Sequence, residues 1–177
     1  FSYRVSGIHA DNFQILGSEL QTKEPLDFEN LSNHLITIVA TDAGGLSVLK
    51  SFRINVIDIN EAPIDLALDN QMVDDTLSLG GRIGILLSTD PDNGDAFTYS
   101  LSSNSAASFQ IGGSGNNELQ TAVKLDSEST YELTNTTTDA GGLSFSKDFT
   151  IKVTNVNETP TALELENQVP PWNLKIK

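Results

Sequence analysis

The side chains in this sequence that could do chemistry are mainly carboxylates, and many of them stand in short polar runs. One run reads Asp58-Ile59-Asn60-Glu61-Ala62-Pro63, and a similar one, Asn155-Val156-Asn157-Glu158-Thr159-Pro160, follows 97 residues later. Carboxylate, amide and backbone carbonyl oxygens are the ligands of Ca²⁺, which takes about six to eight of them. Zn²⁺ is disfavoured, because the chain has no cysteine and only two histidines. These runs indicate binding of a hard divalent cation.

Further carboxylates occupy other turns, and in a β-sandwich the turns gather at the two ends. If two sandwiches follow one another, the carboxylates at the facing ends meet at one junction. Two carboxylates about 5 Å apart repel by roughly 3 kcal/mol at an effective dielectric constant near 20. The cluster therefore needs protonation, separation or a cation, and Ca²⁺ suits it better than Mg²⁺, which tolerates a dense all-protein cage poorly. The junction set is Asp27, Glu29, Asp58, Glu61, Asp90, Asp92 and Asp139.

Composition narrows the class of protein. A net charge of −14 argues against nucleic acid as a partner, because phosphate binding needs a basic surface. A hydrophobic content of 38% is enough to bury a core. No apolar run approaches the roughly 18 residues of a membrane span. No signal peptide opens the chain, so we expect a piece of a longer protein.

The sequence repeats itself with a period of about 97 residues. Thr41-Asp42-Ala43-Gly44-Gly45-Leu46 recurs letter for letter from Thr138 to Leu143, and Phe1-Ser2-Tyr3 recurs as Phe97-Thr98-Tyr99. This period is the size of an immunoglobulin-like sandwich. We therefore predict the end of a first repeat in residues 1–61, a complete repeat in 62–158, and the start of a third or a tail in 159–177.

Short segments of alternating apolar residues, separated by turn residues, predict an all-β fold of tandem Greek-key, immunoglobulin-like sandwiches. Asn135 interrupts the alternation, because it aligns with the apolar Ile38. Either its amide finds backbone partners or this strand is looser than its twin. In the first repeat, strands are expected at 1–5, 13–16 and 18–21 and around Ile36–Ala40 and Phe52–Val56. In the second, seven are expected, at 64–68, 83–88, 97–101, 109–111 and 118–121 and around Tyr131–Leu133 and Phe149–Val153.

Four motifs together resemble the cadherin repeat, in the form common in large bacterial surface proteins. They are Leu26-Asp27-Phe28-Glu29, Asp58-Ile59-Asn60-Glu61-Ala62-Pro63, Asp90-Pro91-Asp92 and Thr138-Asp139-Ala140-Gly141-Gly142. The resemblance implies Ca²⁺ ions bound between successive repeats. It assigns as ligands the acidic pair Asp27 and Glu29, the linker residues Asp58, Asn60 and Glu61 with the carbonyls of Ile59 and Ala62, and the downstream Asp90, Asp92 and Asp139.

The resemblance also implies a second junction beyond residue 158. We expect that site to be weaker, because Asn155 replaces the leading linker aspartate and Pro170-Pro171-Trp172 stands where an early acidic residue belongs. Its implied ligands are Asp75, Asp126, Glu128, Asn155, Asn157 and Glu158.

The function expected from these features is structural and adhesive. Calcium would stiffen an array of repeats in a cell-surface or secreted protein, with neighbouring repeats, other copies of the protein or cell-surface glycans as partners. The alternative is a carbohydrate-binding or spacer module of a secreted polysaccharide-degrading enzyme. We find no catalytic constellation and predict that the chain is not an enzyme.

Overall fold

The computed structural model describes residues 1–160, and it is built of β-strands with two short 3₁₀ helices, η1 (Ala10–Asn12) and η2 (Ala106–Ser108). None of the helices in these residues is long and apolar enough to cross a membrane. The strands are β1 (Ser2–Ser6), β2 (Phe13–Leu16), β3 (Glu19–Thr22), β4 (Asn33–Thr41), β5 (Ser47–Asn55), β6 (Asp65–Leu68), β7 (Met72–Asp74), β8 (Arg82–Thr89), β9 (Thr98–Ser102), β10 (Phe109–Gly112), β11 (Glu118–Thr121), β12 (Thr130–Thr138) and β13 (Ser144–Thr154).

Two compact units make up the chain, and they do not follow the sequence repeat. The first contains Phe1–Leu66 together with two later segments, Ser88–Thr98 and Thr137–Phe145. The second contains Ala67–Leu87, Tyr99–Thr136 and, among the described residues, the segment 146–160. Two turns of the second sequence repeat therefore belong to the first unit, and the repeat boundaries at 61/62 and 158/159 stay predictions.

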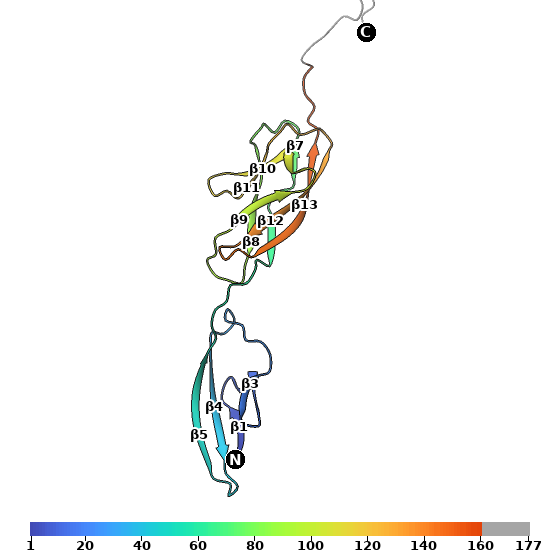
Figure 1. Cartoon of the computed structure of the whole chain (residues 1–177). Coiled ribbons are helices and arrows are strands. Elements are labelled where there is room, and N and C mark those ends of the chain that lie inside the picture. The colour runs from blue at the N-terminus through green and yellow to red at the C-terminus, as the bar shows by residue number, and fades with distance from the viewer. Residues whose placement is uncertain (161–177) are drawn as a thin grey trace, which may run out of the picture. The chain divides into compact units, whose positions relative to one another are not determined.

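In the first unit, β1, β4 and β5 form a three-stranded sheet in the order β1-β4-β5. Strands β4 and β5 pair antiparallel along their whole length and run side by side in Figure 1. Their connection is the expected turn, in which the Asp42 carboxylate accepts the Leu46 N–H at 2.9 Å and Gly45 adopts a φ of +85°. Strands β2 and β3 form a separate hairpin.

Two four-stranded sheets, β10-β11-β8-β6 and β7-β13-β12-β9, build the sandwich of the second sequence repeat. Apolar side chains from both sheets are buried, because alternate residues of each strand turn inward. This confirms the expected all-β sandwich. The most buried apolar residues include Leu66, Leu86, Leu119, Leu133 and Ile151, each 0–1% exposed.

The prediction of seven strands for residues 62–158 was wrong, because the structure has eight there. The additional strand is β7, which pairs in parallel with Lys152–Thr154 of β13. Met72–Asp74 is only three residues long, too short for apolar alternation to appear. The strand depends on pairing with β13 rather than on its own pattern.

Equivalent apolar residues of the two sequence repeats differ in burial. Phe52 of β5 is 39% exposed, whereas its counterpart Phe149 of β13 is 5% exposed. Leu20 of β3 is likewise 40% exposed and its counterpart Leu119 of β11 fully buried. The two sheets of the second repeat bury Phe149 and Leu119 between them. The described strands of the first repeat leave Phe52 and Leu20 partly exposed to solvent.

Asn135 lies in the core of the second repeat with 0% exposure. Neither its amide nitrogen nor its amide oxygen has a hydrogen-bond partner among the described residues. Leaving such polar atoms buried and unpaired costs about 1–3 kcal/mol. The interruption seen in the sequence thus places a polar side chain in the core, and no backbone group of the described residues pairs with it.

Candidate metal centre

Two groups of carboxylates come together within the first compact unit. In the first group, Glu29, Asp58, Glu61 and Asp92 each place one oxygen within 4.8 Å of the others. In the second group, Asp90, Asp95 and Asp139 do the same.

The first group draws on three stretches of chain: the connection between β3 and β4, the segment after β5, and the turn after β8. The turn is tied to the segment by the Glu61 N–H, which donates to Asp92 Oδ2 at 2.8 Å. Within the turn, the Asp92 N–H donates to Asp90 Oδ1 at 3.0 Å, a local bond typical of aspartate turns. These bonds fix the Asp90 and Asp92 side chains with respect to the linker.

Asp139 is the most buried member of the second group, at 5% exposure. Its Oδ1 accepts the Leu143 N–H at 2.8 Å, and its Oδ2 accepts the Asn60 amide N–H at 3.0 Å. Burial alone would raise the pKa of Asp139, but these bonds and the N–H groups of Gly141 and Gly142 hold it below its usual value. Asp139 is therefore a stable anion inside the site.

Gly141 permits the contact between Asn60 and Asp139. A Cβ atom at Gly141 would lie 2.4 Å from Asn60 Oδ1 and 2.5 Å from its Cγ. Any larger residue would push the Asn60 side chain away from its position against Asp139.

Two other oxygens of the second group have no partner within residues 1–160. Asp90 Oδ2 and Asp95 Oδ2 are both buried without a hydrogen bond from the described residues. Burial raises the pKa of Asp95, and the negative charges of Asp90, Asp92 and Asp139 raise it further. A buried carboxylate oxygen without a donor is a costly arrangement that a cation would relieve.

The first group is also electrostatically strained. Burial raises the pKa of Glu61, followed by the charges of Glu29, Asp92, Asp58 and Asp27 in that order. A cavity of about 220 Å³ lies beside the group, lined by Asp58, Asn60, Asp92, Asn93 and Asp95. A site rich in oxygen, free of thiolates and negatively charged fits Ca²⁺.

Most of the junction residues expected from the sequence are among these groups. Asp27 is in neither group, and its Oδ1 accepts the Asn30 N–H at 2.8 Å. Ile59 and Ala62 flank Asn60 and Glu61 in the linker, and a ligand role for their carbonyls stays a prediction. Asp95 was missed by the sequence reasoning, although it closes the acidic turn that begins at Asp90 and Asp92. The expected residues that do meet are Glu29, Asp58, Glu61, Asp90, Asp92 and Asp139, with Asn60 bonded to Asp139.

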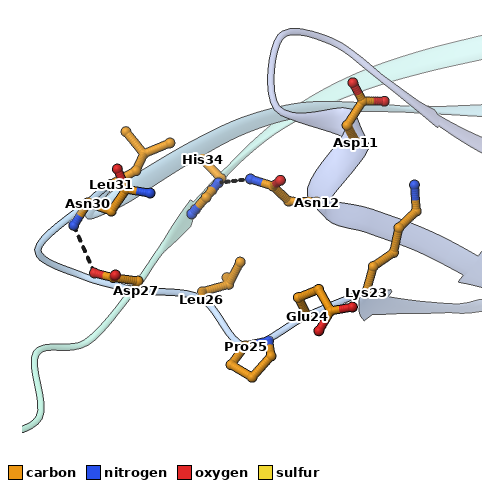
Figure 2. Close-up of a pocket in the computed structure, with 10 residues that line it drawn as sticks. All are labelled: Asp11, Asn12, Lys23, Glu24, Pro25, Leu26, Asp27, Asn30, Leu31 and His34. Carbon is orange, nitrogen blue, oxygen red and sulfur yellow. Dashed lines mark hydrogen bonds between the residues drawn. The ribbon is translucent and has the colours of Figure 1, made fainter.

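A separate cavity of about 330 Å³ lies beside Asp27, and Figure 2 shows its lining. His34, only 3% exposed, forms a side-chain hydrogen bond with Asn12 through Nδ1 at 3.3 Å. Its Nε2 is buried without a partner in the described part of the chain. In Figure 2 the Asp27 carboxylate turns to the Asn30 backbone. Asp27 therefore belongs to the wall of this cavity as well as to the surroundings of the metal centre.

The ligands expected for a second junction do not form a comparable cluster. No third group of acidic or histidine ligands occurs among residues 1–160. Asp75 instead accepts hydrogen bonds from Ser127 and from the Val156 N–H. The roles of Asp126, Glu128, Asn155, Asn157 and Glu158 as ligands remain predictions, and Pro170-Pro171-Trp172 lies outside the described residues.

Comparisons with known proteins agree with this architecture. No family model matches the chain. Human protocadherin gamma-B7 is 31% identical over 159 residues, covering 85% of this chain, and mouse cadherin-17 is 31% identical over 157 residues, covering 81%. The chain spans only 17% and 19% of these two relatives.

Solved structures show the same likeness. The PcdhgB3 EC1-4 structure superposes with a TM-score of 0.67 at 27% identity, covering 88% of this chain and 40% of that one. The cis-dimer structure of protocadherin gammaB7 EC3-6 gives a TM-score of 0.61 at 29% identity, covering 89% and 40%.

The fold and the acidic centre define a tandem β-sandwich repeat protein. With the relatives just described, the chain is made of cadherin-type repeats. Protocadherin gamma-B7 and cadherin-17 are animal proteins, so the expected bacterial origin has no support here. Both relatives are cadherins by name, and this is the family that the four sequence motifs resemble.

Proposed function

We propose that this chain is a calcium-rigidified adhesion module from the extracellular region of a cell-surface or secreted protein. The observation that carries the proposal is the pair of buried oxygens, Asp90 Oδ2 and Asp95 Oδ2. Neither has a hydrogen-bond donor within residues 1–160, and both residues group with a third carboxylate, Asp139. Carboxylates so arranged are stable only with a counter-ion or a proton.

The mechanism follows from the charges. Within each group the carboxylate oxygens lie within 4.8 Å of one another, so their negative charges repel. Without Ca²⁺, this repulsion favours separation of the linker, which carries Asp58 and Glu61, from the turn that carries Asp90 and Asp92. With Ca²⁺, shared ions join the linker to the turn and repulsion becomes attraction.

The two groups suggest two cation positions. Glu29, Asp58, Glu61 and Asp92 would hold one ion. Asp90, Asp95 and Asp139 would hold a second, with the Asn60 amide and the carbonyls of Ile59 and Ala62 as further oxygen donors. Asp27 would act from outside as an additional negative charge.

Extracellular location matches the affinity expected of such a site, because extracellular calcium modules bind at about 10⁻⁴–10⁻³ M. The relatives are cadherins and protocadherins, and one of the similar structures is a cis-dimer. Neighbouring repeats and other copies of the protein are therefore the proposed partners. Nothing in the comparisons supports glycans as partners.

Calcium titration by calorimetry tests the proposal, using a matched pair of variants. Asp139→Asn removes a charged ligand, so calcium affinity should fall by about tenfold, because charge count tunes such sites. Asp42→Asn changes the same residue of the identical turn in the first repeat, which lies outside both carboxylate groups. It should leave the affinity unchanged. Absence of saturable binding at millimolar calcium in the unmodified protein would overturn the proposal.

A further inference from the structure

Asp75, which follows β7, is a predicted ligand that belongs to neither carboxylate group among the described residues, and hydrogen bonds occupy both of its carboxylate oxygens. The residue is 7% exposed. Its Oδ1 accepts the Val156 N–H at 2.9 Å, and its Oδ2 accepts the Ser127 hydroxyl in a short hydrogen bond. Its own N–H donates to the Thr154 carbonyl at 3.0 Å.

These bonds join three stretches of the second compact unit. Asp75 follows β7, and Ser127 lies in the connection between β11 and β12. Val156 is the second residue of the polar run after β13, the outgoing linker (Asn155–Pro160). Hydrogen bonds to a carboxylate are stronger than neutral ones. The Ser127 hydroxyl holds one oxygen of the Asp75 carboxylate and the Val156 N–H holds the other, so this side chain ties the outgoing linker to the connection between β11 and β12.

The charges around Asp75 also differ from those of the metal centre. Lys124 lies near enough to contribute to the lowered pKa of Asp75, and it lines a cavity of about 260 Å³ together with Asp75 and Glu158. The residue before the matching Leu-Asp pair in the first repeat is the uncharged Pro25. Asn155, in turn, stands where the first linker has Asp58. The surroundings of Asp75 therefore include a positively charged side chain, Lys124, where the first repeat has Pro25. The outgoing linker also has one carboxylate fewer than the first linker at this position, because Asn155 replaces Asp58.

We propose that Asp75 is a positioning residue that fixes the outgoing linker through hydrogen bonds, without a divalent cation. The end of the repeat that carries Asp90 and Asp139 then responds to calcium, whereas the end that carries Asp75 does not. Only the first half of this contrast rests on the proposed calcium function. The hydrogen bonds of Asp75 stand independently of it.

Hydrogen exchange of the Val156 amide tests this directly, because that amide is held by Asp75. In calcium-stripped buffer, Asp75→Ala should speed its exchange by about tenfold or more, the effect of losing a charge-assisted hydrogen bond that limits opening. Adding calcium should not restore slow exchange. Asp74→Ala is the matched control: it removes the neighbouring exposed carboxylate and should leave the Val156 amide slow.

Ser127→Ala is a milder variant that keeps the experiment decisive if Asp75→Ala does not fold. It removes one donor from Oδ2 and should speed Val156 exchange less than Asp75→Ala does. If exchange in the unmodified protein is slow only when calcium is present, Asp75 is an ion ligand and the inference is overturned. If the unmodified protein binds no calcium but Val156 is protected and depends on Asp75, the proposed function fails while this inference stands.

Discussion

The amide nitrogen of Asn60 lies 3.0 Å from Asp139 Oδ2, a hydrogen bond between residues 79 positions apart in the sequence. The same amide donates to the Glu61 carbonyl at 3.1 Å. Asn60 therefore attaches the linker to the turn after β12 and gives the buried Asp139 carboxylate one of its donors. This one side chain holds together two of the stretches that carry the acidic groups.

Replacing Asn60 by alanine should destabilise the protein even without calcium. The change leaves Asp139 Oδ2 buried without its donor, at a cost of about 1–3 kcal/mol. Thermal melting in calcium-stripped buffer would measure it. The matched control is Asn157→Ala, because Asn157 is the equivalent, exposed residue of the second linker. Equal melting temperatures for the two variants would contradict the structural role of Asn60.

Gly141→Ala should disturb the hydrogen bond between Asn60 and Asp139 from the side of the turn after β12. The added Cβ would lie 2.4 Å from Asn60 Oδ1, so the Asn60 side chain must leave Asp139. We expect a lower melting temperature and weaker calcium binding, by about tenfold if one charged-group hydrogen bond is lost.

The equivalent glycine of the first repeat provides the control for this variant. A Cβ at Gly44 meets only Asp42 Oδ1, at 3.3 Å, a contact that a small shift can relieve. Gly44→Ala should therefore change calcium affinity little. The same loss of affinity in both variants would point to the turn itself, and not to the Asn60 contact.

Calcium affinity should fall as the pH is lowered from neutral to about 5. The pKa values of Glu61 and Asp95 are raised by burial and by neighbouring carboxylates, so these groups take up protons first and compete with Ca²⁺. Titration calorimetry at the two pH values would measure the difference. An affinity that does not change with pH would show that neither group binds the ion.

In calcium-stripped buffer, protonation of Glu61 and Asp95 should stabilise the fold, although it weakens calcium binding. A carboxyl group whose pKa is raised by folding contributes stability at low pH, and this contribution is lost as the pH rises through the raised pKa. Protonation of Glu61 and Asp95 should therefore raise the melting temperature toward pH 5. Asp75 and Asp139 have lowered pKa values, so the stability that they contribute is lost only when the pH falls below their ordinary value of 3.8.

The repeat period and the acidic turns were sufficient to predict the sandwich fold and most members of the two carboxylate groups, because turns at strand ends gather at the ends of a sandwich. Their roles as metal ligands stay predictions. Local pattern could not reveal β7, whose three residues form a strand only through pairing with β13. Asp95 was overlooked because its oxygen meets Asp139 through folding and not through sequence spacing. The sequence motifs also could not show that Ser127 and the Val156 N–H donate hydrogen bonds to the Asp75 carboxylate, because these contacts form only in the folded chain.

Asn135→Ile should stabilise the second repeat. Both polar atoms of Asn135 are buried and find no partner in the described part of the chain, whereas the equivalent position of the first repeat is Ile38, a residue suited to a strand. Removing the unsatisfied amide should raise the free energy of unfolding by about 1–3 kcal/mol, which chemical denaturation in calcium-stripped buffer would measure. Calcium affinity should stay the same, since Asn135 belongs to neither acidic group. A destabilised Asn135→Ile variant would mean that the amide has partners, such as buried water, that isoleucine cannot replace.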